Sequence, residues 1–392
     1  MRTKFLLAPD VVFLNHGSYG ACPAEVFAEY QRWQRELESN PVEFLGRRSA
    51  TLLADARCSL AAYLGTSSAD LVFVANATTG VNVIAQSIAL QPGDEVLGND
   101  HEYGACAAAW QRACERRGAR YVSASLPLPF DDGSWTERVL AAVTPRTRLI
   151  MASHITSTTA LIFPVADLCR AARERGILTL IDGAHAPGHI ELNIDAIGAD
   201  FYVGNCHKWL CGPKSAGFLH ARPEHQSWIE APVISWGYVG QSMAERSGTL
   251  GGHTGFDAYT GSTVLERRLQ WQGTRDISAC LAVPAAIKFQ RRHHWPAERR
   301  RCHELALHAQ SRVLSRNRLA PVAPDSAYGQ MLTIPVRADD AQALRQRLFD
   351  HYRIEVPVTE HQGRLFVRIS LQAYNDEVDV DKLVRALAEL NA

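Results

Sequence analysis

Short runs of apolar residues alternate with longer segments of mixed polar and apolar spacing between about residues 70 and 220. Short apolar runs bounded by turns are typical of buried strands, and the longer segments are typical of the helices that connect parallel strands. This alternation predicts an α/β fold, a mostly parallel sheet covered by helices on both faces. The predicted strands are 71–74, 95–97, 120–122, 149–152, 179–181 and 201–203, and the predicted helices are 81–90, 105–117 and 165–175.

The pattern changes after about residue 275, where longer helix-like segments precede isolated apolar runs. This order predicts a smaller C-terminal α+β domain over residues 276–392, packed on a large domain over residues 21–275. Residues 11–20 carry little helix signal, and we expect the N-terminal segment, residues 1–20, to lie across the cleft between the domains. The expected C-terminal elements are helices over 277–290, 295–314 and 377–390 and strands over 331–335 and 365–369.

The charge of the chain argues against polyanionic partners. Its 392 residues contain 41 Lys and Arg and 41 Asp and Glu, so no bulk field favours nucleic acid or an anionic membrane. No stretch approaches the roughly 18 uncharged apolar residues of a membrane span. The apolar start of the chain is interrupted by Pro9 and Asp10 without a small-residue cleavage site, which argues against secretion. We therefore expect neither nucleic acid nor membrane as a partner.

The nine cysteines are scattered, and none forms a C-x-x-C pair. An odd number without paired spacing predicts neither a disulfide framework nor a zinc site, so no metal is expected. Reduced thiols are typical of a cytoplasmic protein, which is the expected location.

A lysine and an aspartate stand at the ends of two predicted strands. Asp182 follows the apolar run 178–181, and Lys208, about 26 residues later, follows the run 199–204. Ligands of parallel α/β sheets bind at the carboxyl ends of the strands. A pyridoxal phosphate (PLP) enzyme needs a lysine that forms a Schiff base with the cofactor and a carboxylate that keeps its pyridine nitrogen protonated. The pair predicts PLP as the cofactor; the alternative is a solvated loop lysine.

Two polar turns are candidates for binding the cofactor phosphate. Ala77, Thr78 and Thr79 stand between a predicted strand and a predicted helix, where backbone N–H groups and hydroxyls can bind an anion. The alternative is a simple helix cap. Asn205 and His207, just before Lys208, are expected to reach the same phosphate.

Further candidates surround the predicted ring of the cofactor. His185, three residues after Asp182, can hydrogen-bond the phenolic oxygen. Tyr103 is favoured over His101 to stack on the ring face opposite Lys208 and to exchange a proton there, and the alternative is a surface loop. Arg368 is a charge inside an apolar strand, which predicts a bidentate clamp on a substrate carboxylate rather than a structural ion pair. Pocket candidates near the α-carbon are Asn15, His16 and Tyr19.

Together these segments resemble the class-V aminotransferase family of fold-type-I PLP enzymes, and its isopenicillin N epimerase-like group in particular. The resemblance covers nearly the whole chain. It implies the PLP-dependent transferase fold type I, with a large domain built on a seven-stranded-type sheet and a smaller C-terminal domain. It is carried by Leu14-Asn15-His16-Gly17-Ser18-Tyr19-Gly20, by Asp100-His101-Glu102-Tyr103-Gly104-Ala105, by Trp271-Gln272-Gly273-Thr274-Arg275-Asp276 and by Arg368-Ile369-Ser370-Leu371-Gln372-Ala373-Tyr374-Asn375.

The resemblance also implies roles for single residues. Thr274 would reach the phosphate of the neighbouring subunit, which predicts a homodimer with shared sites, and Ser157 would lie near the ring. The other implied roles repeat those above: Lys208 as Schiff-base lysine, Asp182 at the pyridine nitrogen, His185 at the phenolic oxygen, Thr78, Asn205 and His207 at the phosphate, and Arg368 at the substrate carboxylate.

One departure from the resemblance narrows the reaction. Cysteine desulfurases carry a nucleophilic cysteine shortly before the arginine strand, but residues 352–364 contain none, and the last cysteine is Cys302. A persulfide-forming desulfurase is therefore not expected. We expect an enzyme acting at the α-carbon of an amino acid or amino-acid-bearing metabolite through an external aldimine, epimerase-like. The alternatives are a C–S or other β-lyase, an aminotransferase and, more remotely, a non-catalytic relative.

Overall fold

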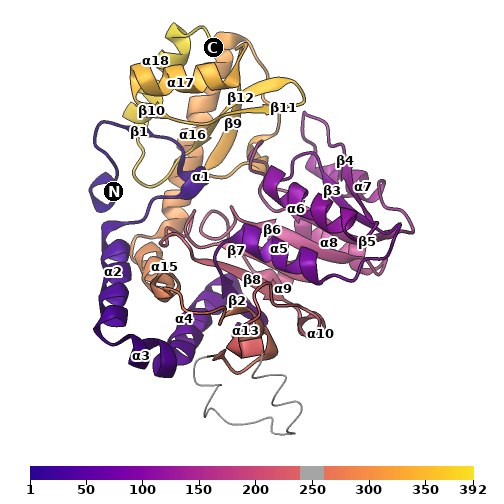
Figure 1. Ribbon diagram of the computed structural model, residues 1–392. Coiled ribbons are helices and arrows are strands. Elements are labelled where there is room, and N and C mark those ends of the chain that lie inside the picture. Colours follow the sequence, from indigo (N-terminus) through magenta and orange to yellow (C-terminus); the bar gives the residue numbers. More distant parts are fainter. Residues whose placement is uncertain (239–259) are drawn as a thin grey trace, which may run out of the picture.

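The computed structural model describes residues 1–238 and 260–392, and a seven-stranded sheet forms its centre (Figure 1). The strand order is β2-β8-β7-β6-β5-β3-β4, and β8 runs in the direction opposite to the other six strands. The predicted mostly parallel sheet is confirmed, and β8 is an addition that the sequence pattern did not predict. The strands are β2 (Leu71–Val74), β3 (Glu95–Asn99), β4 (Arg120–Ala124), β5 (Thr147–Ser153), β6 (Leu178–Gly183), β7 (Phe201–Asn205) and β8 (Gly217–Ala221).

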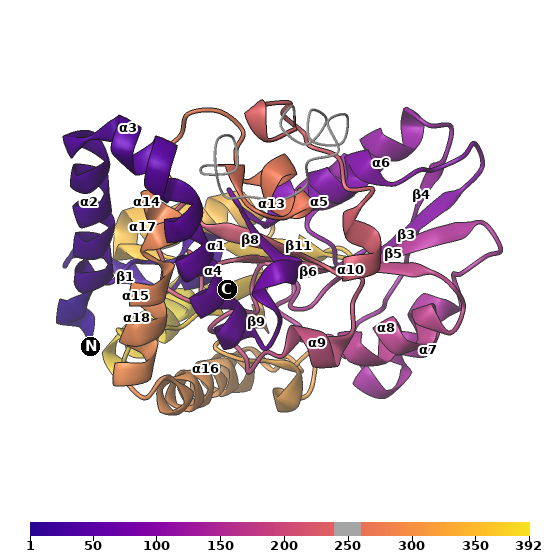
Figure 2. The ribbon, with the colours of Figure 1, turned by 90° about the horizontal axis from the view of Figure 1, so that it is seen from below.

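Helices cover both faces of this sheet (Figure 2). Successive side chains of a strand point to opposite faces, so Leu180 packs into the core on one face and Ile181 into the core on the other. Both cores are apolar and closed to solvent, which holds the strand ends in fixed positions. One face carries α5 (Ala77–Ser87), α6 (Gly104–Glu115) and α13 (Val264–Leu269), and the other carries α7 (Asp132–Leu140), α8 (Val165–Arg173) and α9 (Ile194–Ile197).

The C-terminal part contains a three-stranded antiparallel sheet in the order β11-β12-β9. The expected single helix over 277–290 is wrong in one respect, because it is divided before Val283. Pro284 lies in the first turn of the second piece, where its missing N–H and fixed φ are tolerated. The elements are α14 (Ser278–Leu281), α15 (Val283–Arg292), α16 (Trp295–Asn317), β9 (Met331–Pro335), α17 (Ala341–Tyr352), β10 (Ile354–Glu355), β11 (Val358–His361), β12 (Arg364–Ser370) and α18 (Glu377–Glu389).

The N-terminal segment joins the C-terminal part to the central sheet. Strand β1 (Val12–Phe13) pairs in parallel with β10, and the N–H of Ser370 donates to the carbonyl of Leu14 at 2.8 Å. The short helix α1 (His16–Tyr19) follows, between β12 and the end of β7 (Figure 1). The chain reaches the central sheet through α2 (Ala24–Ser39), α3 (Pro41–Glu43) and α4 (Ser49–Leu64).

Helices α2 and α4 were not among the expected elements, and both pack on α14 and α15. Residues on the two sides of the proposed boundary at residue 275 are therefore in contact, and the domain limits stay predictions. The remaining described α-helix is α10 (Pro223–Gln226). Within residues 1–238 and 260–392, no helix has both the length and the apolar composition to cross a bilayer.

Candidate active site

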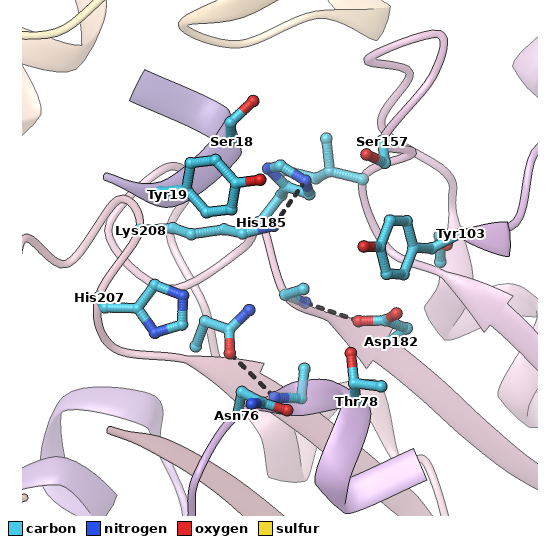
Figure 3. A pocket seen from close by; sticks show the side chains of 15 residues that line it. Ser18, Tyr19, Asn76, Thr78, Tyr103, Ser157, Asp182, His185, His207 and Lys208 are labelled. Carbon is cyan, nitrogen blue, oxygen red and sulfur yellow. Dashed lines mark hydrogen bonds between the residues drawn. The ribbon is translucent and has the colours of Figure 1, made fainter. Parts of the chain in front are cut away.

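A pocket opens at the carboxyl ends of β5, β6 and β7, beside the N-terminus of α5 and the helix α1 (Figure 3). These ends lie side by side because the three strands are parallel and consecutive in the sheet. The pocket is lined by Ser18, Tyr19, Asn76, Ala77, Thr78, Tyr103, Ser153, Ile155, Ser157, Asp182, Ala184, His185, Asn205, His207 and Lys208.

Lys208 lies on the wall of this pocket with its amine turned inward (Figure 3). Its Nζ is 3.1 Å from Nε2 of His185. Desolvation by the surrounding protein lowers the pKa of Lys208 to about 8, although the carboxylate of Asp182 acts in the opposite direction. The neutral fraction of the amine near neutral pH is therefore larger than for an ordinary lysine, and a neutral amine is the nucleophile that attacks an aldehyde.

Asp182 is buried at the end of β6. Its Oδ1 accepts from the N–H of Ala184 at 2.9 Å, and its Oδ2 accepts from the thiol of Cys106 at 3.5 Å. Desolvation by burial raises the pKa of this carboxyl, although the N–H of Ala184 and the charge of Lys208 act in the opposite direction. No cation of the described residues forms an ion pair with it. A protonated pyridine nitrogen would supply the missing positive charge.

His185 connects Lys208 to the protein interior. Its Nε2 faces the amine of Lys208, while its Nδ1 accepts from the indole N–H of Trp209 at 3.2 Å. Burial, followed by the nearby charge of Lys208, holds the pKa of His185 well below its usual value. The ring is therefore neutral at physiological pH.

Two expected phosphate ligands are free to act. Thr78 lies in the first turn of α5 and points into the pocket (Figure 3). Nδ1 of His207 is buried and has no hydrogen-bond partner among the described residues. An orphaned buried nitrogen next to a helix N-terminus matches the requirement of a bound phosphate.

The other expected phosphate ligands are engaged with the protein. The N–H of Ala77 donates to Oδ1 of Asn205 at 2.9 Å, so these two pocket residues bind each other. Thr79 does not line the pocket: its N–H and its hydroxyl both bond to Oδ1 of Asn76, at 2.8 and 3.1 Å. The helix-cap alternative thus holds for Thr79, because Asn76 is the N-cap residue of α5.

Arg368 lies behind the wall formed by Ser18 and Ser157. Only 4% of its surface is exposed, and burial lowers its pKa to about 10. One end of the guanidinium donates to the carbonyl and, at 3.3 Å, to the hydroxyl of Ser157; the other donates to Ser18 Oγ at 3.1 Å and Asn15 Oδ1 at 3.4 Å. Its Nε has no partner, and no carboxylate of the described chain pairs with it. A buried guanidinium in this state calls for an anionic ligand.

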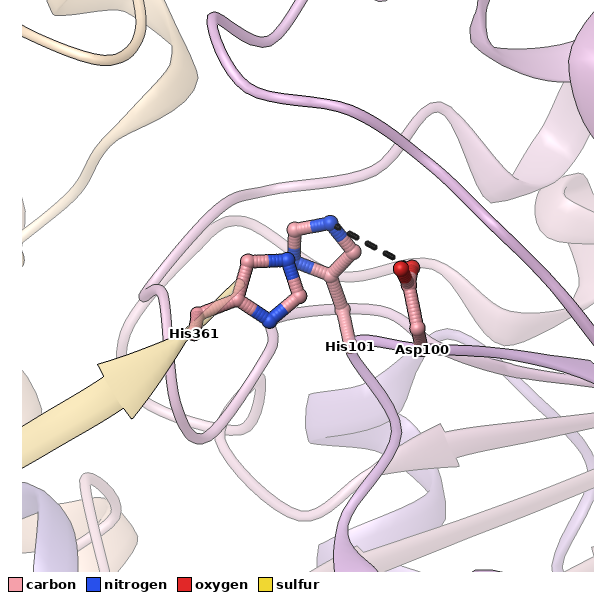
Figure 4. Close-up of side chains that lie close together, drawn as sticks. All are labelled: Asp100, His101 and His361. Atoms are coloured by element: carbon pink, nitrogen blue, oxygen red, sulfur yellow. Dashed lines mark ion pairs between the residues drawn. The ribbon is translucent and has the colours of Figure 1, made fainter. Parts of the chain in front are cut away.

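Tyr103 and His101 differ in position, because only Tyr103 lines the pocket. Tyr103 lines the pocket across from Lys208 and is 47% exposed (Figure 3). His101 is not in the pocket: its ring nitrogens bond to Thr159 Oγ1 at 2.8 Å and to the carbonyl of Leu126 at 2.9 Å. Its ring lies 4.0 Å from that of His361, next to Asp100 (Figure 4). The alternative that His101 serves in place of Tyr103 is therefore wrong.

His16 also lies outside the pocket. Its Nε2–H donates to the backbone carbonyl of Lys208 and its Nδ1 accepts from the hydroxyl of Tyr374, both at 3.0 Å. It is fully buried, and its pKa is lowered to about 3 by desolvation. His16 therefore anchors the backbone that carries the lysine, where we had expected a substrate contact. Tyr19, by contrast, lines the pocket and is 75% exposed.

Thr274 is exposed on a turn after α13 and does not line the pocket of its own chain. Asn15 is buried and does not line the pocket either, but its Oδ1 accepts from Ser18 at 2.6 Å and from Arg368. The predicted contact of Thr274 with a second subunit stays a prediction.

The sequence pattern missed several residues of the site. Ser18 stands inside the quoted segment 14–20, where its spacing from Asn15 is the signal that was available. Glu102 is buried under the pocket and accepts from the hydroxyl and the N–H of Ser153, at 2.6 and 3.1 Å. Burial raises the pKa of Glu102 to about 8. Glu102 has one local partner, the amide of Asn99, but the Ser153 contacts that bring it under the pocket come from 51 residues away.

Comparison with known proteins agrees with this geometry. Residues 12–383 match the Aminotransferase class-V family. The chain is 39% identical over 394 residues to isopenicillin N epimerase of Streptomyces clavuligerus, covering 99% of this chain and 97% of that protein. It is 29% identical to putative L-cysteine desulfhydrase 1 of Oryza sativa subsp. japonica, covering 97% and 83%. A solved structure of a C-DES mutant with glycine covalently linked to its PLP cofactor has a TM-score of 0.82 at 21% identity, covering 99% of each chain.

The pocket residues fit PLP on three independent points. Three groups surround one cavity: an amine of lowered pKa, a buried carboxyl that forms no ion pair with the described residues, and an orphaned imidazole nitrogen. The likeness in fold confirms the predicted fold type I. The chain belongs to the aminotransferase class-V family and is an enzyme whose cofactor is pyridoxal phosphate.

Proposed function

We propose that this enzyme binds an amino acid, or a metabolite that carries one, by its α-carboxylate and inverts the configuration of its α-carbon. The observation that carries the proposal is Arg368, a buried guanidinium with an unpartnered Nε and no acidic partner in the described chain. A substrate carboxylate would complete its hydrogen bonds and neutralise its charge. Full-length relatives named isopenicillin N epimerase support inversion as the reaction.

The proposed roles follow from position. PLP, when bound through Lys208, withdraws electrons from the α-carbon and makes its proton acidic. Asp182 would keep the pyridine nitrogen protonated, and the Nε2–H of His185 would hold the phenolic oxygen. Thr78 and His207 would bind the phosphate, with Asn205 holding the first turn of α5 in place.

Inversion needs one proton acceptor and one proton donor on opposite faces. The amine of Lys208 would take the proton on its face of the substrate, and the hydroxyl of Tyr103 would return one on the other. The two side chains approach the pocket from opposite sides (Figure 3). A return of the proton by Lys208 would give back the starting configuration, so Tyr103 is the residue that distinguishes inversion from simple exchange.

A second candidate is β-elimination from cysteine or a related C–S substrate. Relatives named L-cysteine desulfhydrase support it, at 27 to 30% identity. Elimination would use the same lysine as base, and Tyr103 would protonate the leaving group. A persulfide-forming route is not proposed, because the segment before β12 carries no cysteine.

Incubation in D₂O followed by chiral chromatography separates these reactions. We would use isopenicillin N, which is named by the relatives, and L-cysteine. Deuterium at the α-carbon with inversion supports epimerisation, whereas release of pyruvate and ammonia supports elimination. Formation of a keto acid with an aminated cofactor would instead identify an aminotransferase. Tyr103→Phe should lower inversion about 10²-fold while Lys208 still exchanges the proton on its own face.

We also propose that the enzyme is a homodimer in the cytoplasm and that Thr274 reaches the phosphate of the partner's cofactor. Its exposure on a turn supports this role. Light scattering gives the oligomeric state, and mixed dimers of Lys208→Ala with Thr274→Val test the shared site. If Thr274 serves the partner's site, each mixed dimer keeps one site with both a native Lys208 and a native Thr274. If Thr274 serves its own chain, no site of the mixed dimer has both native residues.

A further inference from the structure

The residue after the lysine, Trp209, holds a fixed position beneath the pocket. It is fully buried, and its indole N–H donates to Nδ1 of His185 at 3.2 Å. Its ring stacks on His189, with 3.9 Å between ring centroids and 22° between planes. His189 is itself fixed, because its Nε2 accepts from the N–H of Gln330 at 2.7 Å and its Nδ1–H donates to the carbonyl of His185 at 3.1 Å. The direction of the indole N–H is therefore set by the packing.

This contact decides where His185 carries its proton. An indole nitrogen donates and cannot accept a hydrogen bond, so Nδ1 of His185 must present a lone pair. The neutral ring then has its hydrogen on Nε2, the atom that lies 3.1 Å from Lys208 Nζ. The doubly protonated ring would place an N–H against the N–H of Trp209, so the contact also disfavours the imidazolium form. His185 can thus offer the pocket a donor and no acceptor.

We propose that Trp209 is a positioning residue that fixes His185 in the Nε2–H tautomer. The hydrogen-bonding partner of His185 must then supply a lone pair. Lys208 can do so only as a neutral amine, which is its reactive form. Resting on the proposed function, the same N–H would later be directed at the phenolic oxygen of PLP and would stabilise its ionised form. With the opposite tautomer, Nε2 would accept from the lysine ammonium and favour the unreactive form.

The first test is the tautomer itself. In the full chain labelled with ¹⁵N-histidine, long-range ¹H–¹⁵N spectra distinguish a protonated Nε2 from a protonated Nδ1, and His185→Gln assigns the signal. We expect Nε2–H at His185 with and without PLP. A protonated Nδ1 in the unmodified protein would overturn the proposal, even if no variant could be purified.

The matched variants are Trp209→Phe and Trp110→Phe. The first keeps an aromatic ring against His189 and removes the N–H. The second removes a buried indole of α6 whose nitrogen has no partner among the described residues. Only Trp209→Phe should give a mixture of tautomers at His185. An unchanged tautomer in a folded Trp209→Phe protein would contradict the proposal.

The second readout is the ionisation of Lys208. The rate at which cofactor-free protein takes up PLP depends on the neutral amine of Lys208. The midpoint of this rate against pH therefore reports the pKa of Lys208. Trp209→Phe should move the midpoint upward by about one pH unit, because the amine can then donate to His185 as an ammonium. The shift caused by Trp209→Phe should vanish when His185 is also changed to Gln. A shift that persists in the double variant would show that Trp209 does not act through His185. Neither readout involves substrate turnover, so failure here is distinguishable from failure of the proposed reaction.

Discussion

The floor of the pocket and the end proposed to bind the substrate carboxylate are built in different ways. On the floor, Asp182 lies at the end of β6 and Lys208 follows the neighbouring parallel strand β7, and the apolar cores on both faces of that sheet hold them. At the other end, Arg368 from β12 meets Ser18 from α1 and Ser157 from the loop after β5, through hydrogen bonds alone. The first region needs only the sheet. The second needs the N-terminal segment and the C-terminal sheet to meet. Substitutions on the floor should therefore affect cofactor chemistry, and substitutions at the other end should affect substrate binding.

The largest effect is expected on the floor. Lys208→Ala removes the amine that binds the cofactor aldehyde, and activity should be lost with the visible absorption band of the bound cofactor. Lys288→Ala removes an exposed lysine of α15 and serves as the control. An active, coloured Lys208→Ala protein would refute the assignment of the site.

Asp182→Asn is expected to have the next largest effect. The amide keeps the shape of the carboxylate and can still accept from Ala184, but it cannot balance a positive charge on the pyridine nitrogen. We expect activity to fall roughly 10³-fold with the cofactor retained and its spectrum altered. If the variant instead bound less PLP, and the PLP still bound had the native spectrum, the role of the Asp182 carboxylate would be purely structural.

Arg368→Met tests the other region, and it should lower the affinity for the substrate while raising the stability of the protein without substrate. Apparent affinity for the substrate carboxylate should fall roughly 10²-fold while PLP binding is unchanged, because a buried charge-assisted contact is removed. Without substrate, the same variant should be more stable to heat, since a buried unpaired charge is replaced by an apolar chain. Arg364→Met, on the exposed start of the same strand, should change neither property. Loss of PLP from Arg368→Met would mean that the two regions are not separable.

The smallest effect concerns stability rather than activity. The pKa of Glu102 is raised to about 8 in the folded chain, above the ordinary value of 4.5, so the folded state keeps a proton that the unfolded state releases. The contribution of Glu102 to the free energy of unfolding should therefore decline as pH rises from about 4.5 to about 8.

Denaturant unfolding of Glu102→Gln against pH measures this contribution. The amide can accept from Asn99 and Ser153 N–H and donate to the Ser153 hydroxyl, so its stability relative to the native chain should rise over this interval. Glu137→Gln, at an exposed position, should show a flat difference. A flat difference for Glu102→Gln as well would mean that this carboxyl is ionised in the fold.

The two regions also differ in how far the sequence revealed them. Asp182, His185, Asn205, His207 and Lys208 all belong to two strand–turn units, and a strand end with a polar turn is a local pattern. Their arrival in one pocket follows from the parallel order of β6 and β7, which the alternation of strands and helices already predicts. Local reasoning succeeded there because the geometry of neighbouring parallel strands is fixed.

His101 and His16 show where local reasoning fails. Each stands in a segment that contributes a pocket residue, two positions before Tyr103 or three before Tyr19. The direction of each side chain depends on a partner. Hydrogen bonds to Leu126 and Thr159 hold the His101 ring away from the pocket. The His16 ring is held by a hydrogen bond to Tyr374, which is 358 residues away in the sequence.

The sequence by itself determined the cofactor, through a strand-end lysine and carboxylate, and it predicted a carboxylate ligand from a charged residue in an apolar strand. Only the tertiary structure decided which side chain of each motif faces the pocket, that Ser18 and Ser157 hold Arg368, and that Trp209 sets the proton of His185. The physical reason is the range of the interactions. The spacing of strands and turns is a property of consecutive residues, whereas a hydrogen bond between buried groups depends on which distant segments the packing brings within about 3 Å of each other.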